Sequence, residues 1–204
     1  MNDTTVFLVD DDASVRDSLS LLLSLKGLRT QVFASAEHFL DTYQPEWRGC
    51  LLTDLRLTGM SGLELQAMLQ ARGINLPVVV ITAHGDVATT RTALQAGALD
   101  FLEKPVDDEV LIDVLRNAIR VDYERHNAVA AMTINTARVE RLTPRERQVF
   151  DFLAEGLQNR DIAERLAISP RTVEVYKARI MEKLQCRNVA EAVKLSIAIA
   201  ATGA

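Results

Sequence analysis

The sequence predicts an α/β domain with a five-stranded parallel sheet, followed by an all-α domain. In the first half of the chain, short apolar runs alternate with helical patterns, which is typical of buried parallel strands joined by crossover helices. In the second half only helical patterns remain. With 204 residues and 48% apolar side chains, the chain can form two domains with separate cores.

Five segments are predicted as strands, because each is short, apolar or β-branched, and bounded by turn or helix-start residues. They cover residues 5–9, 30–33, 50–53, 78–81 and 100–102. Strand and helix alternate five times along this part of the chain. The right-handed crossover rule therefore places the strands parallel in one sheet, with helices on both faces.

Between the strands, apolar residues recur at intervals of three and four, and each series ends before a glycine, as helices with a glycine cap do. The three series are Val15, Leu19, Leu22 and Leu23 before Gly27; Leu63, Leu65, Met68 and Leu69 before Gly73; and Val87, Thr90, Ala93 and Leu94 before Gly97. A further helix is expected from about Asp107. It is predicted to continue into a partly helical linker, residues 122–138, between a first domain of residues 1–121 and a second of residues 139–204.

A strong helix-start signal opens the second domain. Thr143 and Glu146 form a capping box, and Pro144 occupies the first helical position. We therefore predict a helix from there to Glu155, before Gly156.

Two further helices in the second domain are separated by a short turn. Asn159 is expected to cap a short helix, and Ser169 to start a longer, basic one that reaches about residue 185. The turn between them, residues 167–169, gives the helix-turn-helix arrangement. A last helix is expected over residues 189–201.

Charge is distributed unevenly along the chain, whose net charge is -5. Residues 1–121 contain 17 Asp and Glu against 10 Lys and Arg, whereas residues 159–187 contain seven Lys or Arg against four Asp or Glu. This favours a polyanionic partner for the second domain only.

The sequence also points away from a membrane or disulfide-rich protein. No run of about eighteen apolar residues occurs, and residues 1–5 lack a signal-peptide pattern, so a cytoplasmic protein without a membrane partner is expected. Cys50 and Cys186 fall in different predicted domains. Packing thiols are therefore expected, and neither a disulfide framework nor a zinc site.

Five residues with phosphoryl-transfer chemistry follow the ends of predicted strands. They are Asp10, Asp11, Asp54, Thr82 and Lys104. Ligands of such sheets bind beyond the carboxyl ends of the strands, so these side chains are expected to share one pocket. Carboxylates there would hold Mg²⁺ or Mn²⁺, Asp54 would attack phosphorus to form an acyl phosphate, Thr82 would donate to a phosphate oxygen, and Lys104 would pair with the carboxylate and later with the phosphoryl group.

Taken singly, each of these residues has an ordinary explanation. Thr82 is typical of a strand, and Lys104 of a solvated surface. Asp12, the third acidic residue in its run, is predicted to be a helix N-cap rather than a metal ligand. Pro105 is compatible with a cis peptide bond after Lys104, although most such bonds are trans.

Four segments of the first domain resemble the receiver domain of two-component response regulators. They are VFLVDDD, LLTDLRLTGMSG, VVVITAHGD and DFLEKP. The resemblance implies a doubly wound sheet in the strand order 2-1-3-4-5 and a sensor histidine kinase as phosphoryl donor to Asp54. It further implies that Asp10, Asp11, Asp54 and the backbone carbonyl of Arg56 hold the metal.

The resemblance also implies that Thr82 and Phe101 rearrange together after phosphorylation, although Phe101 alone would be read as a core residue. Two departures from the family pattern are visible. Leu57 and Thr58 stand where receivers usually have Met and Pro, and Val106 replaces a common Phe. Neither departure removes a reacting group.

The longer helix after Ser169 has two faces. Val173, Tyr176, Ile180 and Leu184 share the face expected in the core. Residues on or beside the opposite face are candidates for DNA contact. Arg, Glu and Val side chains can read bases, and a Lys side chain can reach a phosphate. The alternative is an ordinary helix surface whose charges are solvated. These candidates are Arg171, Thr172, Glu174, Val175, Lys177, Ala178 and Arg179, with Glu182 on the same face.

The segment LTPRERQVFDFLAEGLQNRDIAERLAISPRTVEVYKARIMEKLQCRN resembles the four-helix DNA-binding domain of the LuxR, NarL and FixJ regulators. The resemblance covers residues 139–204, and the whole-chain pattern is most similar to the FixJ type, particularly in ITAHGDV and ISPRTVEVY. It implies that the last helix is a dimer contact on DNA, whereas the apolar stripe of that helix taken alone predicts core packing.

Together these patterns predict a phosphorylation-dependent transcriptional regulator that dimerises and binds promoter DNA as a homodimer, with RNA polymerase as a further candidate partner. Residues 86–96 and the following strand are the surface expected to change. The only catalysis expected is the chain's own phosphotransfer and dephosphorylation. One alternative is a phosphohydrolase that uses Asp54 as nucleophile. Such an enzyme would need an acidic residue where Arg56 stands and a capping insertion over the pocket, and the sequence has neither. A second alternative is a regulator that binds DNA but has a vestigial pocket that is not phosphorylated.

Overall fold

The structure is a computed structural model that describes residues 4–83 and 87–202. The chain divides into two compact units, Met1–His126 and Asn127–Ala204. Each unit has its own hydrophobic core. Within the described residues, no helix is both long and apolar enough to cross a bilayer.

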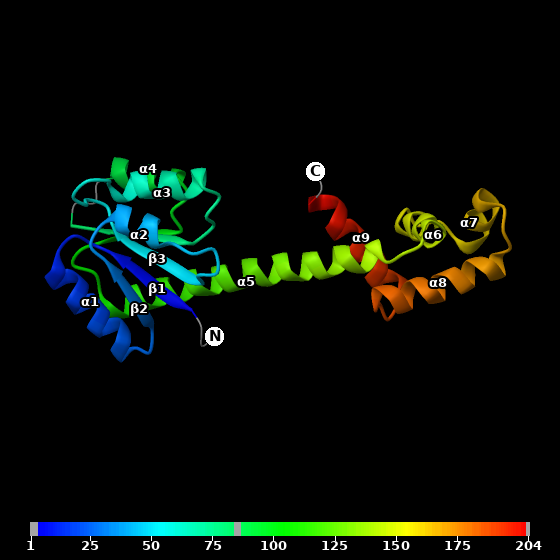
Figure 1. Cartoon of the computed structure of the whole chain (residues 1–204), viewed down its shortest axis with the longest axis horizontal. Coiled ribbons are helices and arrows are strands. Elements are labelled where there is room, and N and C mark those ends of the chain that lie inside the picture. The colour runs from blue at the N-terminus through cyan, green and yellow to red at the C-terminus, as the bar shows by residue number, and fades with distance from the viewer. Residues whose placement is uncertain (1–3, 84–86, 203–204) are drawn as a thin grey trace. The chain divides into compact units, whose positions relative to one another are not determined.

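The first unit is built on a five-stranded parallel sheet (Figure 1). Its strands are β1 (Thr5–Val9), β2 (Arg29–Phe33), β3 (Gly49–Asp54), β4 (Val78–Thr82) and β5 (Asp100–Glu103). All neighbouring pairs are parallel, in the order β2-β1-β3-β4-β5. This order confirms the predicted fold class and the predicted strands to within a residue at each end.

Helices cover both faces of the sheet. They are α1 (Ala13–Leu25), α2 (Ala36–Thr42), α3 (Gly62–Ala71), α4 (Val87–Gln95) and α5 (Asp108–Glu140). Because side chains alternate along a strand, Phe7 and Val9 pack in one core with α2 and α3, whereas Val6 and Leu8 pack in the other with α1 and α5. The helix α4 matches the predicted series from Val87, and Asp86, the expected start of the changing surface, lies outside the described residues.

Helix α2 was not located from the sequence, because its seven residues are too few for a clear periodicity. Ser35 caps it by accepting a hydrogen bond from the His38 amide at 3.2 Å. Its buried Phe39 joins a cluster of aromatic rings in which Trp47 stacks on Phe7 with ring centroids 4.5 Å apart. Both cysteines are free, and burial raises the pKa of the Cys50 thiol to about 12, as expected for packing thiols.

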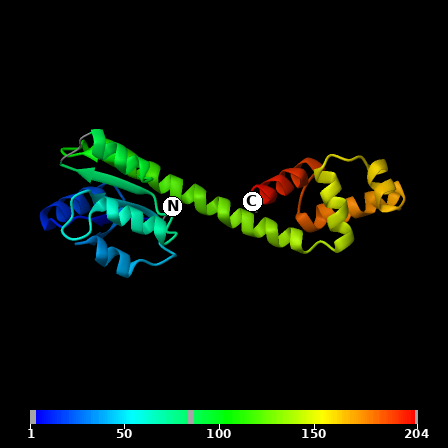
Figure 2. The ribbon, with the colours of Figure 1, turned by 90° about the horizontal axis from the view of Figure 1, so that it is seen from above.

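Helix α5 runs without interruption through the segment predicted to be a partly helical linker (Figure 2). This segment is rich in alanine and contains no glycine or proline, which accounts for the continuous helix. Past residue 121 the helix still packs on the first unit. The buried Asp122 accepts a hydrogen bond from the Gly49 amide at 3.0 Å, and Arg125 donates to the Asn75 carbonyl at 2.6 Å.

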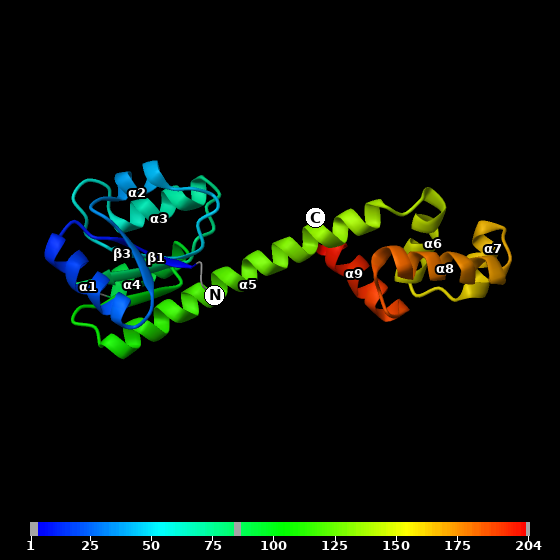
Figure 3. The same cartoon turned by 60° about the horizontal axis from the view of Figure 1, so that its bottom comes forward.

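The second unit contains the end of α5 and four further helices (Figure 3). They are α6 (Pro144–Ala154), α7 (Asn159–Leu166), α8 (Pro170–Leu184) and α9 (Val189–Thr202). The core between them includes the buried Phe150, Ile162, Val173 and Ile180. These helices confirm the predicted helix-turn-helix with a helix on either side of it.

The predicted cap of α7 was wrong by one residue. Gln158 is the N-cap, and its amide donates to Asp161 Oδ2 at 3.3 Å, so Asn159 is the first helical residue. The Asn159 side chain instead accepts a hydrogen bond from Lys177 Nζ of α8 at 2.9 Å. A contact with another helix therefore decides the role of Asn159.

We expect Asp122→Ala to lower the free energy of unfolding of the first unit by about 1–3 kcal/mol, because the buried Gly49 amide loses its acceptor. Urea denaturation followed by the fluorescence of Trp47, the single tryptophan, reports on this unit alone. Asp113→Ala, at an exposed position of the same helix, is the matched control. Equal midpoints for the two variants would contradict the anchoring role of Asp122.

Candidate functional site

The carboxyl ends of four strands bring the predicted pocket residues together. Asp10 directly follows β1, Asp54 and Thr82 end β3 and β4, and Lys104 directly follows β5. The strands are in register at this edge, with Val9 opposite Thr53, Asp54 opposite Ile81, and Thr82 opposite Glu103. Residues separated by almost a hundred positions thereby share one end of the sheet.

Lys104 joins two of the acidic residues. Its Nζ donates to Asp54 Oδ2 at 2.7 Å and to Asp10 Oδ2 at 3.1 Å. Burial alone would lower the pKa of Lys104, but hydrogen bonds and charge attraction from Asp54 and Asp10 outweigh it and raise the pKa above its usual value. The ammonium is therefore held in its charged form between the two carboxylates. The peptide bond between Lys104 and Pro105 is cis.

Backbone amides hold the other oxygens of these carboxylates. Asp54 Oδ1 accepts from the Arg56 amide, and Asp10 Oδ1 from the Asp12 amide, each at 2.9 Å. Asp10 is 1% exposed, whereas the Asp54 side chain is 14% exposed. Of the two, Asp54 is thus the carboxylate that a reagent from solvent can approach.

Asp12 is the N-cap of α1, as predicted. Its Oδ1 accepts a hydrogen bond from the Ser14 amide at 2.8 Å, and it has the extended backbone of a cap. The third acidic residue of the run is therefore occupied in starting a helix.

Asp11 is exposed and turns toward the loop between β3 and α3. Its Oδ2 accepts hydrogen bonds from the Thr58 amide at 3.0 Å and from the Thr58 hydroxyl. The hydroxyl bond is the main cause that lowers the pKa of Asp11 below its usual value. Sequence reasoning missed this contact, although a hydroxyl residue at a position where proline is usual was a visible signal.

In the part of the chain that the structure describes, no three His, Cys, Asp or Glu side chains are arranged to hold a metal ion. Asp10 and Asp54 face Lys104, and Asp11 faces Thr58. The donor set nevertheless suits Mg²⁺, because three carboxylates lie at the ends of β1 and β3 and hard cations prefer carboxylate oxygen.

Glu37 is a second residue of this region that sequence reasoning missed. From α2, its Oε1 accepts a hydrogen bond from the Met60 amide at 2.9 Å, in the loop that carries Thr58. The hydrogen bond from its own backbone, followed by this contact, lowers the pKa of Glu37, so the side chain is held in its charged form as an acceptor for the loop.

The two residues expected to rearrange together occupy neighbouring strands. Thr82 is buried at the end of β4, and Phe101 is half-buried in β5 and packs on the core beside α2 and α3. Of the three residues that depart from the family pattern, Leu57 packs on that same core and Val106 on the opposite one, whereas Thr58 binds Asp11.

The two faces of α8 are those predicted. Val173, Ile180 and Leu184 are fully buried and Tyr176 is partly buried. The candidate DNA-contact residues on the other side are exposed, namely Arg171, Glu174, Val175, Ala178 and Arg179.

Two candidates in α8 make contacts within the unit. The hydroxyl of Thr172 lies 2.8 Å from that of Ser169, the N-cap of α8. Lys177 is half-buried, and its ammonium binds Asn159 of α7. A DNA phosphate would therefore have to compete with Asn159 for Lys177.

A buried carboxylate fixes α6 against α8. Glu146 caps α6 through the Thr143 amide at 2.7 Å and accepts a hydrogen bond from Lys183 of α8 at 2.6 Å. Burial would raise the pKa of Glu146, but the bonds from Lys183 and Thr143 outweigh it and lower the pKa. The position of α8 thus depends on a compensated buried charge.

Comparisons with known proteins identify the family. A family described as response regulator receiver domain matches residues 6–116, and one described as bacterial regulatory proteins, luxR family, matches residues 140–196. The chain is a response regulator of the luxR family.

Relatives of this response regulator share its whole length. FixJ of Azorhizobium caulinodans is 44% identical over 94% of this chain and 91% of its own, and FixJ of Rhizobium meliloti is 41% identical over 97% of both. Among solved structures, the response regulator StyR matches with a TM-score of 0.82 and 41% identity, covering 95% of this chain and 98% of its own. Full-length FixJ from B. japonicum matches with a TM-score of 0.62 and 38% identity over 98% of both.

Membership of this family settles the broad function. The regulator is a phosphorylation-dependent transcriptional regulator, in which the receiver domain implies a histidine kinase as partner and the luxR-type domain implies binding to DNA. It is not an enzyme in the ordinary sense, and the phosphohydrolase alternative is set aside.

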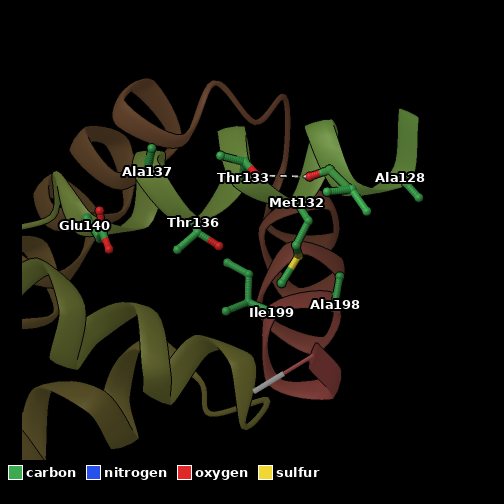
Figure 4. A pocket seen from close by; sticks show the side chains of 9 residues that line it. Ala128, Met132, Thr133, Thr136, Ala137, Glu140, Ala198 and Ile199 are labelled. Carbon is green, nitrogen blue, oxygen red and sulfur yellow. Dashed lines mark hydrogen bonds between the residues drawn. The ribbon is translucent and has the colours of Figure 1, made fainter. Parts of the chain in front are cut away.

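The second unit of the regulator also carries an apolar groove of about 830 Å³ between the end of α5 and α9 (Figure 4). Met132 and Ile199 point toward each other across it, and the Thr133 hydroxyl is turned back to the Val129 carbonyl at 3.1 Å. The groove therefore presents mainly carbon atoms. On α9, Ile197 is 61% exposed.

Glu146→Gln should change how the second unit responds to acid. The lowered pKa of Glu146 means that its charge stabilises the fold above about pH 4.5, its usual pKa, and that this stabilisation is lost as the pH falls through the lower folded value. The variant should be less stable at pH 7 and lose less stability between pH 7 and a pH well below 4.5. Peptide-resolved hydrogen exchange over α6 and α8 measures this, with the exposed Glu155→Gln as control. A parallel pH response of wild type and Glu146→Gln would refute it.

Proposed function

We propose that Asp54 is the phosphoacceptor of this regulator. A carboxylate oxygen of Asp54 attacks the phosphorus of a phosphohistidine in line, the bond from phosphorus to the imidazole nitrogen breaks, and that nitrogen leaves with the electron pair. The product is an acyl phosphate on Asp54. The observation that carries this proposal is the 2.7 Å contact between Lys104 Nζ and the partly exposed Asp54 carboxylate.

The neighbouring residues are proposed to stabilise the transferred group. Lys104 shifts from Asp54 to a phosphoryl oxygen, and Thr82 donates its hydroxyl to another. Asp10, Asp11, Asp54 and the Arg56 carbonyl would hold Mg²⁺ or Mn²⁺, which when bound supplies positive charge to the phosphoryl oxygens. The regulator's own dephosphorylation is proposed to use the same pocket.

Phosphorylation is proposed to act through Thr82 and Phe101, which adjoin α4 and β5. Their joint rearrangement biases this surface toward a homodimer. Dimerisation places two α8 helices about one DNA turn apart, so the promoter site is expected to be roughly palindromic. On DNA, α9 with its exposed Ile197 is proposed as a further dimer contact.

The division of labour along the chain is proposed as a receiver of residues 1–121, a linker of residues 122–138 and a DNA-binding domain of residues 139–204. The first residues of this linker, as far as His126, pack on the receiver. Arg171, Glu174 and Val175 are proposed to read bases. Thr172, Lys177, Ala178 and Arg179 are proposed to contact the backbone or the groove wall. Because its partner is promoter DNA, we propose a cytoplasmic location and RNA polymerase as a further partner.

The central test is intact-protein mass after incubation with Mg²⁺ and a small phosphodonor. Wild type should gain one phosphoryl group, shift toward dimer in sedimentation and bind promoter DNA about tenfold more tightly, which is within the usual range of allosteric coupling. Asp54→Asn should do none of these. Asp12→Asn is the matched control, because asparagine caps a helix as well as aspartate and the phosphorylation should be kept. Phosphodonor-induced dimerisation of Asp54→Asn would contradict the proposal, and equal DNA affinity of wild type with and without phosphodonor would favour a vestigial pocket.

Base reading by α8 is tested with Arg171→Ala. If Arg171 reads a base, the variant should lose about 1–3 kcal/mol of discrimination between bases at one position of the DNA site. Affinities for single-base variants of the site measure this loss. Arg147→Ala, which removes an exposed arginine of α6 paired with Asp151, is the charge-matched control. A uniform loss across all variants would make Arg171 a phosphate contact instead.

A further inference from the structure

We propose that Thr58 is a positioning residue that holds the Asp11 carboxylate and competes with the divalent cation for it. The proposal rests on the function proposed above, in which Asp11 is a metal ligand. Both donors of Thr58, its amide and its hydroxyl, bind the same oxygen of Asp11, the amide at 3.0 Å. Two hydrogen bonds occupy both lone-pair sites of Asp11 Oδ2, so a cation can bind this oxygen only when one of those bonds breaks.

The residue type at position 58 decides whether this contact can form. The family pattern usually places proline here, and proline has neither an amide hydrogen nor a hydroxyl. Threonine supplies both within one residue. A receiver with proline at this position could not form this restraint on its acidic residue.

The loop that carries Thr58 is held by contacts that do not involve Thr58. Glu37 binds the Met60 amide, and α3 begins with a capping box in which Ser61 and Glu64 satisfy each other. Gly59 has φ +85°, a left-handed conformation that suits glycine at this turn. Because the loop is fixed on the far side of Thr58, a substitution there releases Asp11 and leaves the loop in place.

Two further features make Asp11 the ligand that such a contact can control. Asp10 and Asp54 are both held by Lys104. Asp11 is exposed and is not bound by Lys104, so its side chain has room to turn. When the cation takes the Asp11 carboxylate, the amide and hydroxyl of Thr58 are released. The Mg²⁺ concentration at which the regulator can be phosphorylated is thereby set in part by Thr58.

The test measures cation affinity directly, with Mn²⁺ as the probe and the free ion counted by electron paramagnetic resonance. Thr58→Pro, which removes both donors, should bind Mn²⁺ about fivefold more tightly than wild type, as expected for the net loss of one competing hydrogen bond or more. Thr58→Val keeps the amide and loses the hydroxyl, so its affinity should lie between the two. Thr58→Ser keeps both donors, so its Mn²⁺ affinity should match that of wild type. The Mg²⁺ concentration for half-maximal phosphorylation should fall in the same order, with the rate at saturating Mg²⁺ unchanged.

Thr42→Val is the matched control, because it removes a hydroxyl that binds the His38 carbonyl elsewhere in the same unit. Unchanged urea midpoints by Trp47 fluorescence establish that each variant is folded. Equal Mn²⁺ affinities for wild type, Thr58→Val and Thr58→Pro, with normal phosphorylation of Asp54, would overturn the competition alone. Tighter Mn²⁺ binding by Thr58→Pro in a protein that is never phosphorylated would leave the competition standing and overturn the proposed function.

Discussion

The ion pair of Lys104 with Asp10 and Asp54 is the interaction on which the first unit's chemistry depends. Two carboxylates at adjacent strand ends repel each other, and Asp10 is buried, so an uncompensated charge there would be costly. The ammonium of Lys104 binds both carboxylates, offsets one of their two negative charges and connects the ends of β1, β3 and β5. Only a parallel sheet brings these three ends to the same edge, which is why a phosphoacceptor pocket can be assembled from residues so far apart in the sequence.

The second unit follows the same physical rule with different residues. Glu146 is buried, and its charge is compensated by an amide of its own helix and by Lys183 of α8. One carboxylate therefore starts α6 and determines where α8 lies, while α8 turns its polar side to solvent. In both units, a buried carboxylate is paired with a lysine from another element. Asp10 pairs with Lys104 in the first unit, and Glu146 pairs with Lys183 in the second. Such pairs are sensitive to the loss of either member, because the remaining charge stays buried.

The features that follow from periodicity and from the order of strands could be predicted from the sequence. These features include the strands, the helices around them and the contact between Asp54 and Lys104. The crossover rule makes the strands parallel, so their carboxyl ends lie at the same edge of the sheet. Features set by side-chain direction could not be predicted. For the turn of Asp11 to Thr58, the sequence offered only a hydroxyl residue where proline is usual. Nothing in the pattern says that Lys177 binds Asn159 and leaves the cap of α7 to Gln158. Helix α2 was missed because about two turns of helix carry too little periodicity.

The hydrogen bond between Asp122 and Gly49 has a consequence for any attempt to isolate the receiver. The receiver family matches only as far as residue 116, yet the carboxylate that satisfies the first amide of β3 comes from Asp122, six residues later. A fragment ended at the family boundary would leave the start of a central strand with an unsatisfied donor and expose the sheet beneath it. A free-standing receiver should therefore be cut no earlier than His126, where the compact unit itself ends.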